Sequence, residues 1–295
     1  MNTHTDLAIE LKEQLEEAVS DAGGYTFEEH QEAGGQIRIS RVQITNEVGE
    51  RQFGRKRGTY ITIEVPQMHQ AGVALHKRIV SCVVKQIRST AIWDQPDILL
   101  VGIGNRDITS DALGPCTVSA TCVNRHRNLL MNHAAAYNVS ALVPGVMSQT
   151  GMESLDIIKG VISQTHPKLL IVVDALASRS MHRVNRTIQI SDTGIAPGSG
   201  LKNYRLVLDK EALGIPVLAI GVPTVVSTVT ILADMLEGIA GGKWKDEILA
   251  SLPENFSENG SDMFVTTKNI DEEIQCLSLI LSHAIEECYG LTGAI

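Results

Sequence analysis

The chain has 295 residues, of which 43% are hydrophobic and 20% charged; this is enough apolar material for a large folded core and excludes disorder as the overall state. Its formal net charge of −9 and its aromatic content of 4% argue against a basic or base-stacking surface, so we expect no direct nucleic-acid binding.

The N-terminal quarter of the chain combines one helix with alternating strands. Leucines at helical spacing predict a helix over residues 7–20, and a polar connector follows over residues 25–35. Alternation of apolar and polar residues over 35–66, interrupted by turn residues at 46–49, predicts two or three antiparallel strands. The basic run over residues 51–57 is typical of a solvated loop.

From residue 71 onward, helices and strands alternate. Helices are predicted at 71–90, 115–130, 150–165, about 225–240 and 267–290, and strands at 97–105, 140–143, 168–176, 186–192 and 215–223. Residues 252–262 have the composition of a surface loop. The alternation predicts an α/β fold with a single doubly wound, mostly parallel sheet flanked by helices, and an additional small antiparallel β region near the N-terminus.

Cysteine usage and hydropathy indicate the compartment. The five cysteines include no CxxC pair, which favours reduced thiols over a disulfide framework or a zinc knuckle. The polar first ten residues and the absence of a long apolar run predict a cytoplasmic protein with neither a signal peptide nor a membrane span.

The first buried strand leads into a candidate site, because sites in open α/β sheets gather at the carboxyl ends of parallel strands. Gly102, Gly104 and Asn105 form a turn whose backbone N–H groups are candidate donors to a substrate or an oxyanion. Asp111 follows at the start of the next helix, as either a site carboxylate or a helix N-cap. The third glycine of a G-x-G-x-x-G fingerprint is missing, which weakens the alternative of a nucleotide- or small-molecule-binding module.

Two later strands also end in polar residues. Asp174 closes a run of five aliphatic residues and is either part of a site or a cap or ion-pair partner of Arg179. Asp192, Gly194 and Gly198 form a loop that either surrounds a ligand or simply turns, and they are further candidates for contacts with a substrate or oxyanion.

A pair of carboxylates delivered from adjacent strands suits two kinds of chemistry. Asp111 and Asp174 can activate water as general base and general acid, or they can bind a divalent metal. The sequence contains no HExxH zinc motif and no G-x-S-x-G nucleophile motif.

Five motifs in order resemble the germination protease of spore-forming bacteria: GIGNRDITSDALGP (102–115), VPGVMSQTGMES (143–154), LLIVVDALASRS (169–180), TIQISDTGIAPGSGLKNYR (187–205) and LAIGVPTVVS (218–227). The resemblance implies an endopeptidase that degrades small acid-soluble spore proteins in the spore core. That family is similar in core fold to hydrogenase maturation endopeptidases, and their acidic positions correspond to Asp111 and Asp174. The metal-binding His of the maturation enzymes has no match here, so we expect an aspartate mechanism without metal or cofactor. A metal-dependent peptidase is the alternative.

The same family is made as a zymogen that removes a short N-terminal propeptide by self-cleavage. Thr5, Asp6, Leu7 and Ala8 resemble the acidic–hydrophobic–Ala site that the protease recognises, which implies cleavage between Asp6 and Leu7. Residues 1–6 are then the propeptide and 7–295 a single α/β peptidase domain. Thr5 or Asp6 can also cap the first helix. The resemblance further implies a homotetramer.

Overall fold

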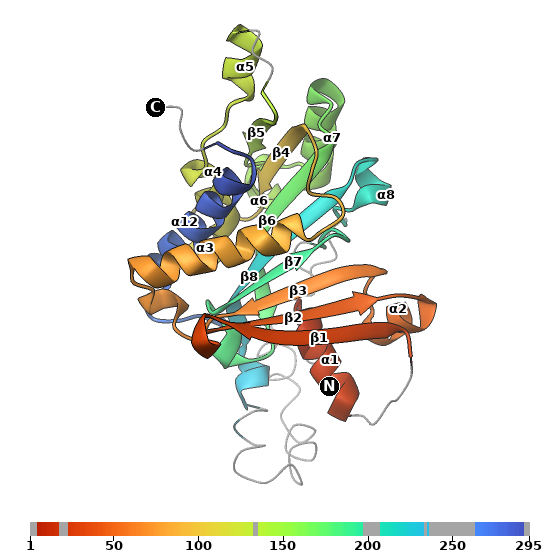
Figure 1. Ribbon diagram of the computed structural model, residues 1–295, viewed down its shortest axis with the longest axis vertical. Helices are drawn as coiled ribbons and strands as arrows, with labels where there is room; N and C mark the ends of the chain where they lie inside the picture. The colour runs from red at the N-terminus through yellow and green to blue at the C-terminus, as the bar shows by residue number, and fades with distance from the viewer. Residues whose placement is uncertain are drawn as a thin grey trace.

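The computed structural model describes residues 5–17, 23–131, 135–196, 207–232, 235 and 263–291. Within these residues the chain forms one nine-stranded sheet in the order β1-β2-β3-β7-β8-β6-β4-β5, with β9 paired to β8 (Figure 1). The strands are β1 (Tyr25–Glu32), β2 (Ile37–Ile44), β3 (Gly58–Glu64), β4 (Asp97–Gly102), β5 (Asn138–Leu142), β6 (Leu169–Ser178), β7 (Thr187–Ser191), β8 (Val217–Ser227) and β9 (Phe264–Val265).

Helices cover both faces of this sheet. They are α1 (Ala8–Glu17), α2 (Glu47–Phe53), α3 (Val73–Arg88), α4 (Leu113–Ala120), α5 (Arg125–Met131), α6 (Met147–Thr150), α7 (Ser154–Thr165), α8 (Lys210–Leu213) and α12 (Ile270–Cys288). Short 3-10 helices are η1 (Ala33–Gly35), η2 (Met68–Gln70), η3 (Thr109–Asp111) and η4 (Met181–Arg183).

The parallel core of the sheet consists of β5, β4, β6 and β8. Strand β7 runs antiparallel to both β8 and β3, so the N-terminal strands β1–β3 continue the same sheet instead of forming a separate one. The predicted fold class is therefore confirmed: a helix-flanked α/β sheet with a parallel core and antiparallel strands near the N-terminus.

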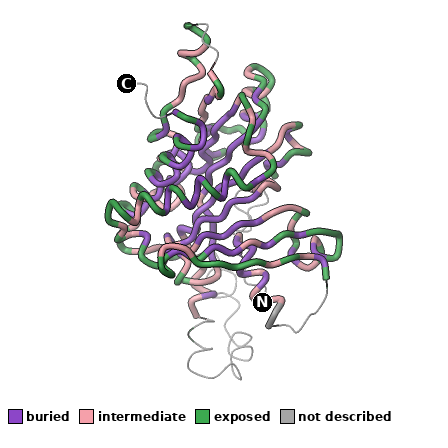
Figure 2. Tube along the Cα trace, viewed as in Figure 1, coloured by how far each residue is buried: buried purple, intermediate pink, exposed green. Residues whose placement is uncertain are grey.

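Alternation along the central strands divides the core between the two faces. Ile98 and Leu100 of β4 pack in the large cluster beneath α3 and α12, whereas Leu99 and Val101 pack with α7 and α8. Helices α1 and α2 cover β2 and β3 on the α7 side. Buried residues accordingly run along the middle of the sheet, and exposed residues line the edge strand β1 and the outer helix surfaces (Figure 2).

The segment 25–35, predicted as a polar connector, is instead strand β1 followed by η1. Its sequence, YTFEEHQE, shows only two apolar residues in alternation, because β1 is an edge strand with most of its side chains in solvent. Full pairing with β2, from Tyr25 opposite Ile44 to Glu32 opposite Ile37, holds it in the sheet.

The turn predicted at 46–49 is the start of α2. The Asn46 side chain caps this helix by accepting hydrogen bonds from the N–H groups of Val48 (2.9 Å) and Gly49 (3.2 Å), and Gly54 ends it in the left-handed conformation. The helix predicted at 115–130 is two helices, α4 and α5. The loop predicted at 252–262 and much of the helix predicted at 225–240 lie outside the described residues.

Candidate active site

Asp174 lies in the middle of β6, not at its end as the sequence suggested, because β8 pairs with β6 as far as Ser178. The other neighbour, β4, stops at Gly102, opposite Val173. Asp174 therefore lies one residue beyond the last residue that β4 pairs, at the carboxyl-end edge of the parallel strands, where ligands of open α/β sheets bind. It is 3% exposed, and its carboxylate accepts a hydrogen bond from the Ala175 N–H (2.9 Å).

Asp111 ends η3, which contacts both β6 and β8. The Thr224 hydroxyl of β8 holds this turn by donating to the Ser110 carbonyl (2.6 Å). The N-cap of α4 is Ala112, so the interpretation of Asp111 as the cap of that helix is wrong. Its carboxylate accepts the Asn105 N–H (2.7 Å) instead, which closes the loop after β4. Both candidate aspartates thus lie at the end of the sheet where β4 stops.

The glycine turn allows close packing of backbone against backbone. A Cβ on Gly102 would lie 2.3 Å from the Gly114 carbonyl oxygen, and one on Gly104 (φ 118°) would lie 2.0 Å from the Asp111 carbonyl oxygen. These positions require glycine so that η3 and α4 can approach β4. The Asn105 N–H, predicted as a donor to substrate, is directed to Asp111.

The loop after β7 is tied back to its surroundings. The Asp192 carboxylate accepts the Thr59 N–H (2.7 Å) of β3. Gly194 has a φ of 87°, and a Cβ there would lie 2.2 Å from the Leu208 carbonyl oxygen. In this structure Asp192 and Gly194 therefore fix the loop, whereas Gly198 lies outside the described residues.

The N-terminal segment containing Asp6 and Leu7 is docked onto β6 and β7. The Asp6 N–H donates to the Ala177 carbonyl (3.0 Å), and the Ala177 N–H donates to the Asp6 carboxylate (2.9 Å). The Gln189 amide binds on both sides of Leu7: Nε2 donates to the Asp6 carbonyl (2.9 Å), and Oε1 accepts the Ala8 N–H (2.7 Å). Leu7 is fully buried.

One row of the sheet connects this segment with Asp174. Asp174 of β6 pairs with Gly221 of β8, which pairs with Gln189 of β7, so Asp174 and Gln189 project on the same side. At about 4.8 Å per strand, their Cα atoms are about 10 Å apart. The Leu176 side chain lies over Gly221, between them, and also packs with Leu7.

The basic run predicted as a solvated loop makes specific ion pairs. Arg55 donates to the Thr5 carbonyl (3.0 Å) and lies 3.7 Å from the Asp6 carboxylate. Lys56 binds the Asp209 carboxylate (2.9 Å), and its hydrogen bonds to Glu211 and Asp209 raise the pKa of its ammonium group. Arg55 therefore neutralises the acidic residue just before the predicted cleavage bond.

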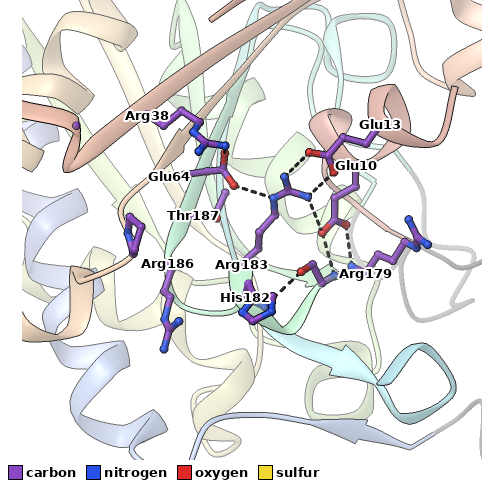
Figure 3. Close-up of a pocket in the computed structure, with 12 residues that line it drawn as sticks. Glu10, Glu13, Arg38, Glu64, Arg179, His182, Arg183, Arg186 and Thr187 are labelled. Atoms are coloured by element: carbon purple, nitrogen blue, oxygen red, sulfur yellow. Dashed lines mark hydrogen bonds and ion pairs between the residues drawn. The ribbon is translucent and has the colours of Figure 1, made fainter. Parts of the chain in front are cut away.

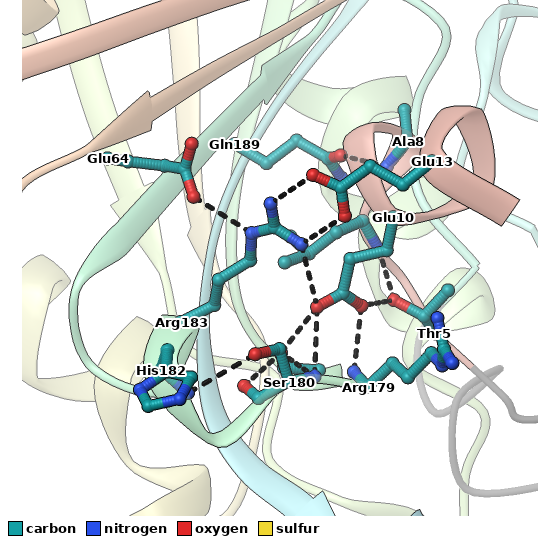
Figure 4. A network of polar contacts seen from close by, with 12 residues as sticks. Thr5, Ala8, Glu10, Glu13, Glu64, Arg179, Ser180, His182, Arg183 and Gln189 are labelled. Carbon is teal, nitrogen blue, oxygen red and sulfur yellow. Dashed lines mark hydrogen bonds and ion pairs between the residues drawn. The ribbon is translucent and has the colours of Figure 1, made fainter. Parts of the chain in front are cut away.

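Glu10 of α1 anchors the segment after that bond. Its carboxylate, 1% exposed, accepts hydrogen bonds from the Ser178 hydroxyl (2.9 Å) and from the N–H groups of Arg179 (2.7 Å) and Ser180 (3.0 Å) (Figure 4). Arg183 (3.4 Å) and the Thr5 hydroxyl bind the same carboxylate. A buried carboxylate needs this many donors to offset the loss of water.

Arg183 joins α1 to the sheet through three carboxylates. It binds Glu13 through both terminal nitrogens (2.6 and 2.8 Å) and Glu64 through Nε (2.9 Å), besides Glu10. Burial disfavours its charge, but the hydrogen bond to Glu13 and the charges of the three carboxylates outweigh this and raise the pKa of the guanidinium.

A cleft of about 510 Å³ opens beside this network (Figure 3). Neither Asp111 nor Asp174 lines it. Its walls come from α1, β2, β3, β7, the β6–β7 connection and neighbouring loops, and consist of Glu10, Glu13, Gly35, Arg38, Glu64, Pro66, Arg179, Ser180, His182, Arg183, Arg186 and Thr187.

Sequence reasoning missed three residues that hold the N-terminal segment: Gln189, Arg55 and Glu10. Gln189 reads as an ordinary polar position of an alternating strand, and only the sheet register relates it to Asp174. Arg55 was visible within a basic run but had no identifiable partner. Nothing in the sequence distinguishes Glu10 from the other glutamates of its helix.

Comparison with known proteins identifies the family. The family model described as germination protease matches residues 2–246. The germination protease of Caldanaerobacter subterraneus subsp. tengcongensis is 38% identical, covering 97% of this chain and 93% of that protein. Those of a Geobacillus species and of Bacillus pumilus are 42% and 44% identical, over 81% and 82% of this chain and 67% and 69% of theirs. The chain therefore belongs to the germination protease family, and it is a protease.

Among solved structures, a [NiFe] hydrogenase maturation protease from Thermococcus kodakarensis matches 69% of this chain and 99% of its own, with 18% identity and a TM-score of 0.37. In the part of the chain that the structure describes, no helix has the length and apolarity needed to cross a bilayer. Nor do three or more His, Cys, Asp or Glu side chains gather in the described ranges as a set that could hold a metal ion.

Proposed function

We propose that this protease is made as a zymogen that hydrolyses its own Asp6–Leu7 bond and then degrades small acid-soluble spore proteins during germination, with Asp111 and Asp174 activating the water. Residues 1–6 are the propeptide in this proposal, and 7–295 the peptidase domain. The observation that carries it is the docking of this bond: its carbonyl accepts a hydrogen bond from Gln189, in the same sheet row as Asp174.

The docked segment has the features of a bound peptide substrate. The Asp6 N–H donates to the Ala177 carbonyl, a contact that any peptide can make, whereas the Ala177 N–H and Arg55 both bind the Asp6 carboxylate and so favour an acidic residue here. The buried pocket around Leu7 supplies the preference for an apolar residue next. An acidic residue followed by an apolar residue is the pattern proposed for the spore-protein cleavage sites.

The hydrolysis needs one ionised and one protonated aspartate. The carboxylate of one takes a proton from water while the water oxygen attacks the Asp6 carbonyl carbon. The carboxylic acid of the other gives its proton to the Leu7 nitrogen as the C–N bond breaks. The products are a carboxyl group on Asp6 and an amino group on Leu7, and the pair of aspartates still holds one proton. Carboxylates close enough to interact divide their protonation in this way.

Leu176 explains why the docked bond can persist in a precursor. Its side chain lies over Gly221, between the row positions of Asp174 and Gln189. It has to move aside, or the segment has to shift along the row, before an aspartate-activated water reaches the Asp6 carbonyl. This arrangement supports slow, regulated self-cleavage.

The experiment is degradation of purified acid-soluble spore proteins by the self-processed enzyme and by Asp111→Asn and Asp174→Asn variants. Each variant is expected to lose nearly all activity, whereas Asp192→Asn, whose carboxylate accepts the Thr59 N–H, keeps it. Full activity in either of the first two variants would exclude its catalytic role. Activity that disappears on exhaustive chelation and returns with added metal would replace the aspartate mechanism by a metal-dependent one.

The spore-core location and the homotetramer belong to the same proposal and rest on family membership. Light scattering of the purified chain during size-exclusion chromatography tests the assembly; a monomer at all concentrations would contradict it.

A further inference from the structure

We propose that Gln189 is a catalytic residue whose amide stabilises the oxyanion formed on the carbonyl of the cleaved bond. The inference rests on the proposed cleavage between Asp6 and Leu7. Gln189 contacts the reacting carbonyl directly. Of the glycine-turn N–H groups predicted from the sequence, that of Asn105 donates to Asp111 instead.

The orientation of the Gln189 amide follows from its two partners. The Ala8 N–H is a donor and needs an acceptor, so Oε1 faces it at 2.7 Å. Nε2 is then left to face the Asp6 carbonyl oxygen, at 2.9 Å. One side chain thereby fixes the peptide groups on both sides of Leu7, and the bond between Asp6 and Leu7 cannot rotate away from the donor without losing both contacts.

The donor is also buried and rigidly mounted. Gln189 is 9% exposed, and its strand is paired on both sides, with Thr62 of β3 and Gly221 of β8. A pre-oriented donor shielded from water stabilises developing negative charge more strongly than a solvated one and needs no reorganisation during the reaction. Gly221, between Gln189 and Asp174, presents no side chain of its own to the row.

The role in the reaction is electrostatic. As the water oxygen bonds to the Asp6 carbonyl carbon, the π electrons of the carbonyl move onto its oxygen. The hydrogen bond from Gln189 Nε2 to that oxygen then strengthens. When the C–N bond breaks and the Leu7 nitrogen takes its proton from an aspartate, the electrons return to re-form the carbonyl. Gln189 gains and loses no proton.

The test is Gln189→Glu in the full-length chain, followed by the first-order rate of loss of residues 1–6. This change keeps the volume and the acceptor for the Ala8 N–H but removes the donor at neutral pH. We expect the rate to fall about 10²- to 10³-fold, as for removal of one oxyanion donor. The rate relative to wild type should recover as the pH falls and the introduced carboxyl becomes protonated, because it then donates again. Gln43→Glu, the same change at an exposed position of β2, is the matched control and should cleave at the wild-type rate.

Gln189→Met supplies a second variant without a charge; it should be slow at every pH. Circular dichroism and hydrogen exchange over residues 7–10 establish that the segment stays folded and docked in Gln189→Glu. Equal rates in Gln189→Glu and wild type, or a deficit that persists unchanged at low pH with the segment docked, would overturn the role of Gln189. Absence of cleavage in the wild type would instead refute the proposed function, so the two failures are distinguishable.

Discussion

Replacement of Glu10 by Gln tests whether the buried carboxylate network anchors the N-terminal segment. The change preserves shape but turns one acceptor oxygen into an NH₂ group. If the NH₂ group takes the Oε2 position, it cannot accept the Arg179 N–H, which donates there at 2.7 Å; if it takes the Oε1 position, it cannot accept the Ser180 N–H, which donates there at 3.0 Å. The ion pair with Arg183 at 3.4 Å is lost as well.

The magnitude follows from these contacts. An unsatisfied buried N–H costs about 1–3 kcal/mol. Breaking a buried ion pair costs about 3–5 kcal/mol when no other partner remains, but Arg183 keeps Glu13 and Glu64, so only a fraction of that applies. We therefore expect Glu10→Gln to lower the free energy of unfolding by about 2–4 kcal/mol.

Urea denaturation of the full-length chain at neutral pH measures the loss. Glu13→Gln is the control, because Glu13 binds the same arginine but its side chain is 42% exposed; we expect it to cost less than about 1 kcal/mol. If Glu10→Gln costs no more than Glu13→Gln, burial of the carboxylate does not anchor the segment and the reasoning fails.

Two further predictions concern the ion pairs of Arg55 and Lys56. Arg55→Met should slow self-cleavage about tenfold, equivalent to about 1.4 kcal/mol, because it removes the guanidinium beside the Asp6 carboxylate; an unchanged rate constant by mass spectrometry would exclude this contribution. Burial raises the pKa of Asp209. The hydrogen bonds that its carboxylate accepts from Lys56 and from the Ala212 N–H outweigh burial and hold the pKa below its usual value. The lowered pKa of Asp209 stabilises the folded chain at pH values above the pKa that Asp209 has in the unfolded chain. This stabilisation is lost as the pH falls through the lower pKa of the folded chain. Asp209→Asn should therefore destabilise the chain at pH 7 and converge with wild type in strong acid, measured by thermal unfolding; a constant difference across that range would contradict it.

The fold and the two aspartates could be predicted because their signals are local. An aliphatic run ending in a carboxylate marks Asp174, and a glycine turn leading to an acidic residue marks Asp111. Both signals are local, because a buried parallel strand needs a continuous apolar run and the turn that follows it needs glycine where the backbone packs closely. Even so, the true end of β6 was missed, since it depends on how far β8 extends beside it.

The residues that bind the N-terminal segment could not be predicted, because their roles arise from contacts between distant segments. Gln189 and Ala8 are 181 positions apart, and Arg55 and Thr5 are 50 apart. The spacing of apolar residues along the sequence does not indicate contacts between such distant residues. Gln189 becomes informative only when the register places it in the row of Asp174. The edge strand β1 could not be predicted from apolar content either, because its hydrogen-bonded pairing with β2 keeps it in the sheet.

The most direct measurement is the intact mass of the purified full-length chain as it is left to self-process. The account predicts loss of residues 1–6, with cleavage between Asp6 and Leu7, at equal rates in wild type and Asp192→Asn and not at all in Asp111→Asn or Asp174→Asn. Cleavage at another bond, or undiminished cleavage in either of the last two variants, would contradict it.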